Sequence, residues 1–316
     1  SYWFIESETL GKVSVGRTRP AAKTITETNL ANTKDVAKFS DVEDTGLGLG
    51  VRFANGVIGL RNNGAIFAYR RLIDFSGDQP GEPDYGQLVR YDSTEMAGFT
   101  ASATWGGDDY WDVALRYAGE FSGFQVAAAI AYGKETSADG DANMIDECLA
   151  IAANGTANCH QLGGSVSVMH TATGLYANFG TGIRTDENID TRFDAPNRAD
   201  KNSTFWAIET GLQQKFWALG ATTLFGQYYD FNGGSDDRTD LSFDGNPANA
   251  FNIANTAMDM LGGGVVQKID AADMLLYLYY RHYESDVTLV DNAGITQDHP
   301  PIEDLDIVVA GGLIRF

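Results

Sequence analysis

Hydrophobic and polar residues alternate with a period of two along many short segments of this chain. The segments 99–105 (FTASATW), 111–117 (WDVALRY) and 124–132 (FQVAAAIAY) each place apolar side chains on one face and small or polar side chains on the other. This alternation is the pattern of a β-strand whose two faces meet different surroundings. Each apolar face also begins and ends with an aromatic residue. Aromatic residues at both ends of an apolar band are typical of a strand that crosses a membrane in a β-barrel.

The same pattern predicts an all-β protein with about fourteen strands in a single barrel domain, residues 1–316. The predicted strands are 2–6, 11–18, 65–72, 85–92, 99–105, 111–117, 124–132, 162–170, 175–184, 204–216, 218–231, 256–268, 272–284 and 305–316. Short turns at 106–109, 120–123, 171–174 and 269–271 alternate with long acidic loops at 135–161, 185–203, 232–255 and 285–304. Short turns at one rim and long loops at the other favour a transmembrane antiparallel β-barrel.

Composition and charge narrow the functional class. The chain has 22 basic and 43 acidic residues, a formal net charge of −21, which disfavours nucleic acid as a partner and fits an interior that attracts cations. No apolar run approaches the roughly 18–20 residues of a membrane helix. The four histidines, His160, His170, His282 and His299, fall in loops or near strand ends. This placement predicts no catalytic dyad, and we expect no enzymatic activity.

Two features of the long loops suggest further chemistry. Cys148 and Cys159 lie in one polar loop, and we interpret them as a disulfide formed in an oxidising compartment, with two free thiols as the alternative. The acidic stretches 139–146 and 236–244 offer oxygen ligands for Ca²⁺ or Mg²⁺, which could bridge to anionic lipid headgroups. Their spacing completes no calcium-loop pattern, so a solvated acidic surface is the alternative. We expect no other cofactor.

One connection, residues 19–63, is about 45 residues long and contains the Gly-spaced apolar stretch 46–60 (GLGLGVRFANGVIGL). A loop of this length is usually functional, and its apolar part needs a surface to pack against, which the inside of a large barrel provides. The run 10–18 (LGKVSVGRT), this long loop and 65–71 (AIFAYRR) together resemble the corresponding strands and inward-folded third loop of Gram-negative general diffusion porins of the alphaproteobacterial type.

The resemblance implies an outer-membrane protein in contact with lipid and lipopolysaccharide, a homotrimer, and a constriction where loop acids face wall arginines. Carried over by position, Arg17 and Arg70 match wall arginines, and the nearest loop acids are Asp35, Asp41, Glu43 and Asp44. Lys38 departs from the family pattern, which has an acid there. Strand parity independently predicts that Lys12, Arg70, Arg90, Arg116 and Arg281 face the lumen.

Such porins have sixteen strands, whereas fourteen are visible here. Either roughly 80 to 100 residues precede this sequence or the barrel closes with fourteen strands; the abrupt start at Tyr2 favours the first. The resemblance implies passive diffusion of small hydrophilic solutes and ions, and the net charge adds a preference for cations. The alternatives are a channel selective for sugars, through Tyr277 and Tyr279, or for amino acids, and a secreted soluble β-rich binding protein.

Overall fold

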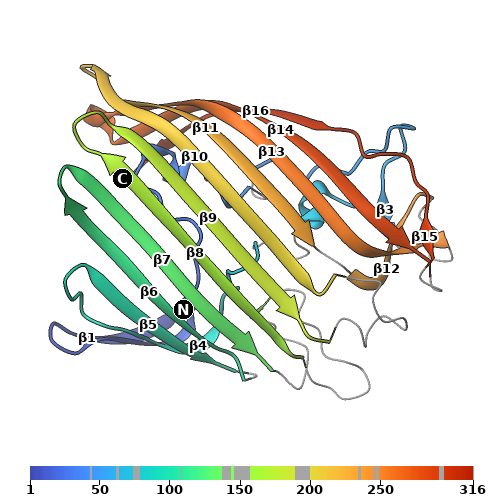
Figure 1. Cartoon of the computed structure of the whole chain (residues 1–316), viewed down its shortest axis with the longest axis horizontal. Helices are drawn as coiled ribbons and strands as arrows, with labels where there is room; N and C mark the ends of the chain where they lie inside the picture. The colour runs from blue at the N-terminus through green and yellow to red at the C-terminus, as the bar shows by residue number, and fades with distance from the viewer. Residues whose placement is uncertain are drawn as a thin grey trace.

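The computed structural model describes residues 1–42, 45–61, 64–73, 79–107, 109–136, 144–145, 157–188, 200–233, 236–244, 246, 249–291 and 295–315, with the backbone alone at 236–240. These residues form a 16-stranded antiparallel sheet (Figure 1). The long strands are β1 (Tyr2–Ser7), β2 (Gly11–Thr18), β4 (Gly86–Asp92), β5 (Phe99–Gly106), β6 (Trp111–Phe121), β7 (Phe124–Glu135), β8 (Cys159–His170), β9 (Leu175–Asp186), β10 (Asn202–Trp217), β11 (Gly220–Gly233), β13 (Phe251–Ile269), β14 (Met274–Val290) and β16 (Leu305–Ile314). Every predicted strand except 65–72 is present, which confirms the predicted all-β class.

The long strands pair with their neighbours in chain order, from β1 to β16. Short additions complete the sheet: β12 (Asp236–Ser242) pairs with β13 and with β3 (Leu60–Arg61), and β15 (Thr296–Gln297) pairs with β14. Within the described residues, β1 pairs only with β2, and β16 only with β14. None of the helices in the described part of the chain is long and apolar enough to cross a membrane.

The two faces of the sheet differ as the alternation predicts. On β8, Leu162 and Val166 are exposed, whereas Gln161, Ser165 and Ser167 are buried. The other strands repeat this arrangement, and their exposed apolar residues include Val13, Val89, Trp105, Val113, Leu115, Ile130, Leu175, Phe179, Ile208, Leu224, Leu261, Leu276, Leu278 and Val308. A continuous apolar outer face of this size is a contact surface for hydrocarbon, because soluble proteins rarely leave such a face in water.

The sheet curves around the chain segment that joins β2 to β4. This inserted segment contacts β5 and β6 through Ala21, contacts β8 through Leu30, and reaches Arg315, just after β16, through Asp35. Since about fifteen residues meet strands from both halves of the sheet, the wall must bend around them. In Figure 1 the segment, coloured blue to cyan, lies inside the curve of the sheet.

The predicted strand at 65–72 is wrong. Its place beside β2 is taken by β4, with Lys12 opposite Asp92, so the inserted segment continues to Tyr85 rather than ending at Asn63. Residues Tyr69–Leu72 form the short 3₁₀ helix η2, and Ile66 and Ala68 make only isolated bridges. The alternation that suggested a strand is real, because Phe67 and Tyr69 are buried. They are buried by packing inside the barrel wall and not by pairing with a neighbouring strand.

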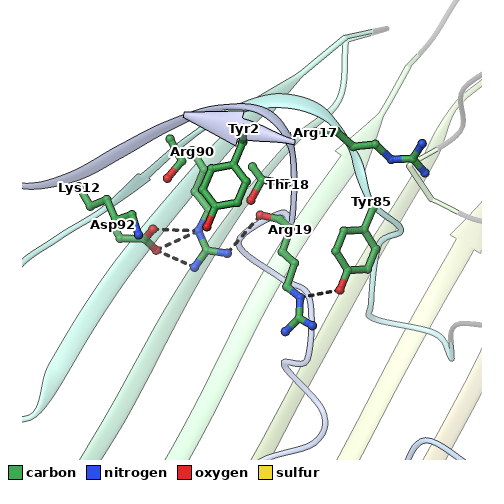
Figure 2. A pocket seen from close by; sticks show the side chains of 9 residues that line it. Tyr2, Lys12, Arg17, Thr18, Arg19, Tyr85, Arg90 and Asp92 are labelled. Carbon is green, nitrogen blue, oxygen red and sulfur yellow. Dashed lines mark hydrogen bonds and ion pairs between the residues drawn. The ribbon is translucent and has the colours of Figure 1, made fainter. Parts of the chain in front are cut away.

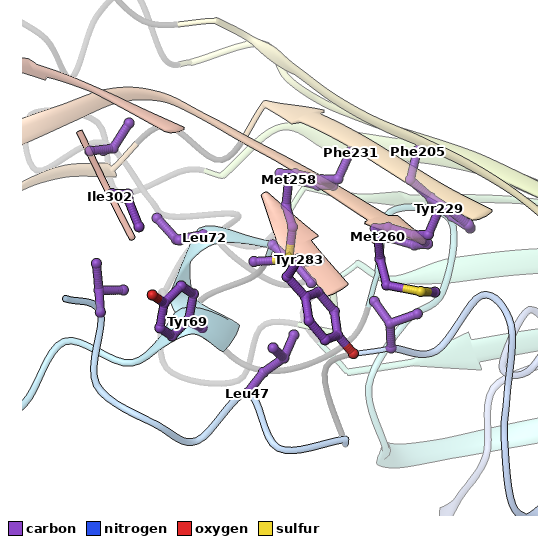
Figure 3. Packing of buried hydrophobic residues seen from close by; sticks show 14 of the residues in the cluster. Leu47, Tyr69, Leu72, Phe205, Tyr229, Phe231, Met258, Met260, Tyr283 and Ile302 are labelled. Carbon is purple, nitrogen blue, oxygen red and sulfur yellow. The ribbon is translucent and has the colours of Figure 1, made fainter. Parts of the chain in front are cut away.

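The second half of the inserted segment forms an apolar cluster with the inner wall. Leu47, Tyr69 and Leu72 pack with Met258, Met260 and Tyr283 of β13 and β14, and with Phe205, Tyr229 and Phe231 of β10 and β11 (Figure 3). Burying one large apolar side chain contributes about 1.5–3 kcal/mol. This cluster therefore attaches residues 45–73 firmly to one side of the wall.

Candidate functional site

The first half of the inserted segment follows the inner wall through hydrogen bonds from its backbone. The N–H groups of Thr28 and Leu30 donate to the hydroxyls of Ser165 and Ser167 on β8, at 3.1 and 3.0 Å. The N–H of Asn32 donates to the Gln213 amide oxygen on β10, at 2.8 Å. Polar side chains of the wall thus replace the backbone partners that a strand would provide, and they satisfy half-buried N–H groups whose burial without a partner would be costly.

Two carboxylates of the wall also accept hydrogen bonds from the inserted segment. Asp112 on β6 accepts from the N–H groups of Ala21 and Ala22, at 3.2 and 2.7 Å. Glu209 on β10 is fully buried and accepts from the Thr33 hydroxyl at 2.7 Å. The charge of each carboxylate strengthens these hydrogen bonds relative to neutral ones.

Glu82 performs a similar role from within the inserted segment. Its carboxylate accepts from the N–H groups of Thr24 and Thr26, at 2.7 and 2.9 Å, and so joins the end of the segment to its beginning. Burial raises the pKa of Glu82, while Lys23 and Thr26 act in the opposite direction. The two ends of the insertion are therefore one connected unit.

Three of the arginines predicted from strand parity, Arg90, Arg116 and Arg281, face inward and hold the backbone of the inserted segment, whereas Arg70 is not on a strand. Arg116 donates to the carbonyls of Ala21 and Lys23, at 2.8 and 3.0 Å, and Arg90 donates to the carbonyl of Pro20 at 2.9 Å. Arg281 donates to the carbonyl of Lys38 and is fully buried. This corrects the expectation for Arg281, because a fully buried guanidinium anchors the segment and does not border open water.

Small residues on the inner face let the segment approach the wall closely. A Cβ added to Gly182 would lie 1.8 Å from the carbonyl oxygen of Pro80, and one added to Gly180 would lie 2.5 Å from that of Thr26. No side chain fits at either distance. These two β9 glycines, called the glycine seat below, therefore leave the space in which the backbone of the inserted segment contacts the wall.

A charged cluster lies where the inserted segment turns back. Lys38 pairs with Glu27 at 3.2 Å and with Asp41. Burial raises the pKa of Glu27 to about 8, helped by the charges of Glu82 and Asp41 and opposed by Lys38. Burial lowers the pKa of Lys38, but Asp41 and Glu27 outweigh it, so the pKa of Lys38 lies above its ordinary value. Lys38, at the position where the resemblance to general diffusion porins implies an acid, is thus a cation that forms ion pairs with two acids.

The residues assigned to a constriction by resemblance are dispersed. Asp35 pairs with Arg315, and Asp41 pairs with Lys38, so each of these loop acids meets a cation other than Arg17 or Arg70. Arg70 lies in η2, against β13 and β14, and Arg17 is exposed at the end of β2, on the parity of Val13 and Val15. Glu43 and Asp44 lie outside the described residues. The constriction assignment stays a prediction.

A cavity of about 450 Å³ opens between β1, β2, β4 and the start of the inserted segment (Figure 2). The Nε of Arg19 donates to the Tyr85 hydroxyl at 2.5 Å. Arg90 and Asp92 form a bidentate ion pair, with Nη2 to Oδ1 at 2.6 Å. The other lining residues used below are Tyr2, Lys12 and Arg17, and Arg17 points away from the Arg90–Asp92 pair. The lining contains four cations and one carboxylate, so it is basic in an otherwise acidic protein.

Comparison with known proteins decides the family. Residues 1–288 match the family described as Gram-negative porin. The chain belongs to this family. The protein is therefore a non-enzymatic channel of the outer membrane. Its apolar outer face and its inward-folded segment are features of a porin barrel.

Three solved structures are similar to this porin over most of its length. OmpT of Vibrio cholerae is 13% identical, with 99% of this chain and 78% of that chain covered, at a TM-score of 0.46. An anion-selective porin from Comamonas acidovorans is 12% identical, with 99% and 76% covered, at a TM-score of 0.48. OccK5 (OpdH) of Pseudomonas aeruginosa is 11% identical, with 98% and 79% covered, at a TM-score of 0.43. No curated protein sequence matches this chain significantly.

Two predictions about the loops of this porin stay predictions. Cys159 is buried at the start of β8, but Cys148 lies outside the described residues, so their pairing is not tested. The acidic stretch 139–146 is described only at Met144 and Ile145, and the side chains of 236–240 are outside the description. Elsewhere in the described chain, no group of three or more His, Cys, Asp or Glu side chains is placed to hold a metal ion.

Several anchoring residues were not singled out from the sequence. Glu209, Ser165, Ser167 and Gln213 all occupy inward positions of their strands and form hydrogen bonds to the inserted segment. The inward parity of Glu209, Ser165 and Ser167 follows from the sequence, since each lies next to an exposed apolar residue, Ile208 or Val166. Their partners do not follow from it, because a polar inward residue in a porin could equally face water.

Proposed function

We propose that this porin forms a water-filled channel for passive diffusion of small hydrophilic solutes and ions, with a preference for cations. The observation that carries the proposal is the inserted segment, which is fixed along the inner wall by side chains of β5, β6, β8, β10 and β14. A segment fixed inside a barrel narrows the water-filled path and so limits the size of the solutes that pass.

Cation preference is supported by the net charge of −21. A negative potential around and inside a channel raises the local concentration of cations and lowers that of anions. On the inserted segment, Lys38 balances the charge of Asp41, and Glu27 adds a negative charge inside the barrel when it ionises, with a pKa of about 8. The basic cavity beside β2 acts in the opposite direction, so the measured selectivity reports the balance of the two.

A channel selective for sugars receives no support from the tyrosines that suggested it. The rings of Tyr277 and Tyr279 stack on the inner face of β14, with centroids 6.0 Å apart. However, Tyr279 is only 4% exposed and packs in a cluster with Ala31, Ala37 and Phe225. The inserted segment covers this ring, which leaves little surface for a sugar.

Reconstitution into a planar bilayer tests the channel. We expect stable conductance steps in KCl and a reversal potential, under a KCl gradient, that has the sign of cation selectivity. Anion selectivity would contradict the preference, and a folded protein that produced no conductance would contradict the channel.

We also propose a homotrimer that contacts outer-membrane lipid and lipopolysaccharide. Cross-linking of the detergent-extracted porin should trap trimers, and a product that stopped at monomers would overturn this assembly.

A further inference from the structure

The basic cavity differs from the other charged sites inside the wall because only one of its four cations, Arg90, has a carboxylate partner among the described residues. Two of the others, Lys12 and Arg19, are on its inner side, while Arg17 has the outward parity of β2. Among the described residues, no Asp or Glu pairs with Lys12 or Arg19. The one carboxylate in the lining, Asp92, already accepts three hydrogen bonds from Arg90 and one from Ser102. An anion entering the cavity would therefore meet uncompensated positive charge at Arg19, whereas Lys12 lies opposite Glu6 of β1 and Asp92 of β4 in the strand register.

Aromatic rings flank these two cations. The Arg19 guanidinium carbon lies 5.5 Å from the centroid of the Tyr85 ring, and the Lys12 ammonium lies 4.1 Å from that of Phe4. The centroids of Tyr2 and Phe4 are 6.3 Å apart on the inner side of β1, and Tyr2 is 50% exposed. Tyr85 is 39% exposed. The Lys23 ammonium also lies 5.7 Å from the centroid of the Tyr85 ring, so the half-exposed ring of Tyr2 offers the larger surface for stacking.

Hydrogen bonding also orients one of the cations. The Nε of Arg19 is engaged by the Tyr85 hydroxyl, and this contact holds the guanidinium at the edge of the ring. The two terminal nitrogens keep their N–H groups for a bidentate contact with a carboxylate, the geometry in which a guanidinium binds best.

We propose that this cavity binds small organic anions in which a carboxylate is attached to a flat aromatic ring. The carboxylate contacts Arg19, with Lys12 as a second positive charge of the same lining, and the ring stacks on Tyr2 or on the exposed part of Tyr85. The volume of about 450 Å³ falls in the range of roughly 300–1,000 Å³ that ligand pockets occupy. The inference rests on the proposed channel and deepens it, by naming a solute class that pauses at this wall while other ions pass.

Channel block tests the proposal with benzoate as the probe. Single-channel conductance in KCl is measured while benzoate is added, and the measurement is repeated with cyclohexanecarboxylate, which has the same charge and similar size without a flat ring. We expect benzoate to reduce the conductance at a concentration about three- to tenfold lower, since ring stacking contributes about 0.5–1.5 kcal/mol. Equal block by the two anions would overturn the aromatic part of the proposal.

Variants locate the block. Arg19→Gln should raise the half-blocking benzoate concentration about tenfold, because it removes a charge-assisted contact worth about 1.5–3 kcal/mol. Lys12→Gln provides a second variant in case Arg19→Gln fails to fold. Lys215→Gln removes the same charge from a 60% exposed side chain at the β10–β11 turn and should change nothing. Block that is unchanged in both cavity variants would place the site elsewhere.

The failure of the channel and the failure of the cavity can be told apart. Equilibrium dialysis of benzoate against the folded porin in detergent measures binding without any conductance. Binding that Arg19→Gln weakens, in a protein that does not conduct, would uphold the cavity and remove the channel. KCl conductance with neither block nor binding by benzoate would uphold the channel and overturn the cavity.

Discussion

The carboxylate of Asp112 accepts a hydrogen bond from the backbone N–H of Ala22 at 2.7 Å, across 90 positions of sequence. Asp112 is fully buried on β6, and Ala22 is fully buried in the inserted segment. Further hydrogen bonds follow along the wall. The N–H groups of Thr28 and Leu30 donate to the hydroxyls of Ser165 and Ser167, and the Thr33 hydroxyl donates to the Glu209 carboxylate. The inserted segment is thus a structural part of the wall, and the properties of the channel depend on the residues that hold it.

Removing the buried carboxylate of β10 should loosen the inserted segment. Glu209→Leu leaves the Thr33 hydroxyl and the Asn178 side-chain amide without their acceptor, and it removes one of the two acceptors of the Gln227 amide, which keeps the Ala37 carbonyl. We expect the free energy of unfolding to fall by about 3 kcal/mol, because buried donors without partners are costly. Urea unfolding in detergent measures this. Glu120→Leu, at an exposed position of β6, is the matched control, and an equal loss in both variants would contradict the anchoring role.

The glycine seat on β9 makes a steric prediction. Gly182→Ala places a Cβ 1.8 Å from the carbonyl oxygen of Pro80, so the segment around Pro80 must move away from the wall. We expect a loss of about 1–3 kcal/mol in stability and an altered single-channel conductance. Gly107→Ala has no atom within 4 Å of the new Cβ and should behave as the parent protein. Parental conductance and stability in Gly182→Ala would show that Pro80 does not occupy the seat.

The cluster around Lys38 predicts pH-dependent selectivity. Glu27 has a pKa of about 8 in the folded protein and an ordinary value of 4.5, so the folded state keeps this proton to a higher pH than the unfolded chain does. The contribution of Glu27 to the free energy of unfolding therefore falls as the pH rises from about 4.5 to about 8, and it is constant above that window. Ionisation adds one negative charge inside the barrel.

We expect cation selectivity, measured by reversal potential, to increase between pH 6 and pH 9 in the parent protein. The variant Glu27→Gln has no carboxylate to ionise at this position and should abolish this change. Glu120→Gln should retain it, because Glu120 is exposed at the C-terminal end of β6. A pH-dependent increase of the same size in Glu27→Gln would assign the titration to another group.

The apolar outer face makes a prediction about lipid. Leu115 lies in the middle of β6 and is 44% exposed. It is on the same outer face as Val113 of β6 and Trp105 of β5, which are also exposed. Leu115→Arg should reduce stability in lipid vesicles by about 2–4 kcal/mol, the cost of a charge at the centre of a bilayer. Glu120→Arg, near the β6–β7 turn, should cost about 1 kcal/mol or less. Equal stability of Leu115→Arg and the parent would show that this face does not meet hydrocarbon.

The sequence determined the strands and their two faces, because alternation is a local property that each strand carries by itself. It also indicated that residues 46–60 pack inside the wall. The tertiary structure decided where the inserted segment ends and what holds it. The alternation at 65–72 has the same appearance whether Phe67 and Tyr69 pair with a strand or pack against Met258 and Tyr283.

The tertiary structure also decided which charged residues meet. Asp35 with Arg315 joins positions 280 apart, and Arg281 with Lys38 joins positions 243 apart. No local pattern specifies such pairs, because they depend on how far the wall bends around the segment. The alternation of a strand shows that Arg90, Arg116 and Arg281 point inward, but only the folded barrel shows that they bind the inserted segment and that Arg90 also lines the basic cavity with Lys12 and Arg19.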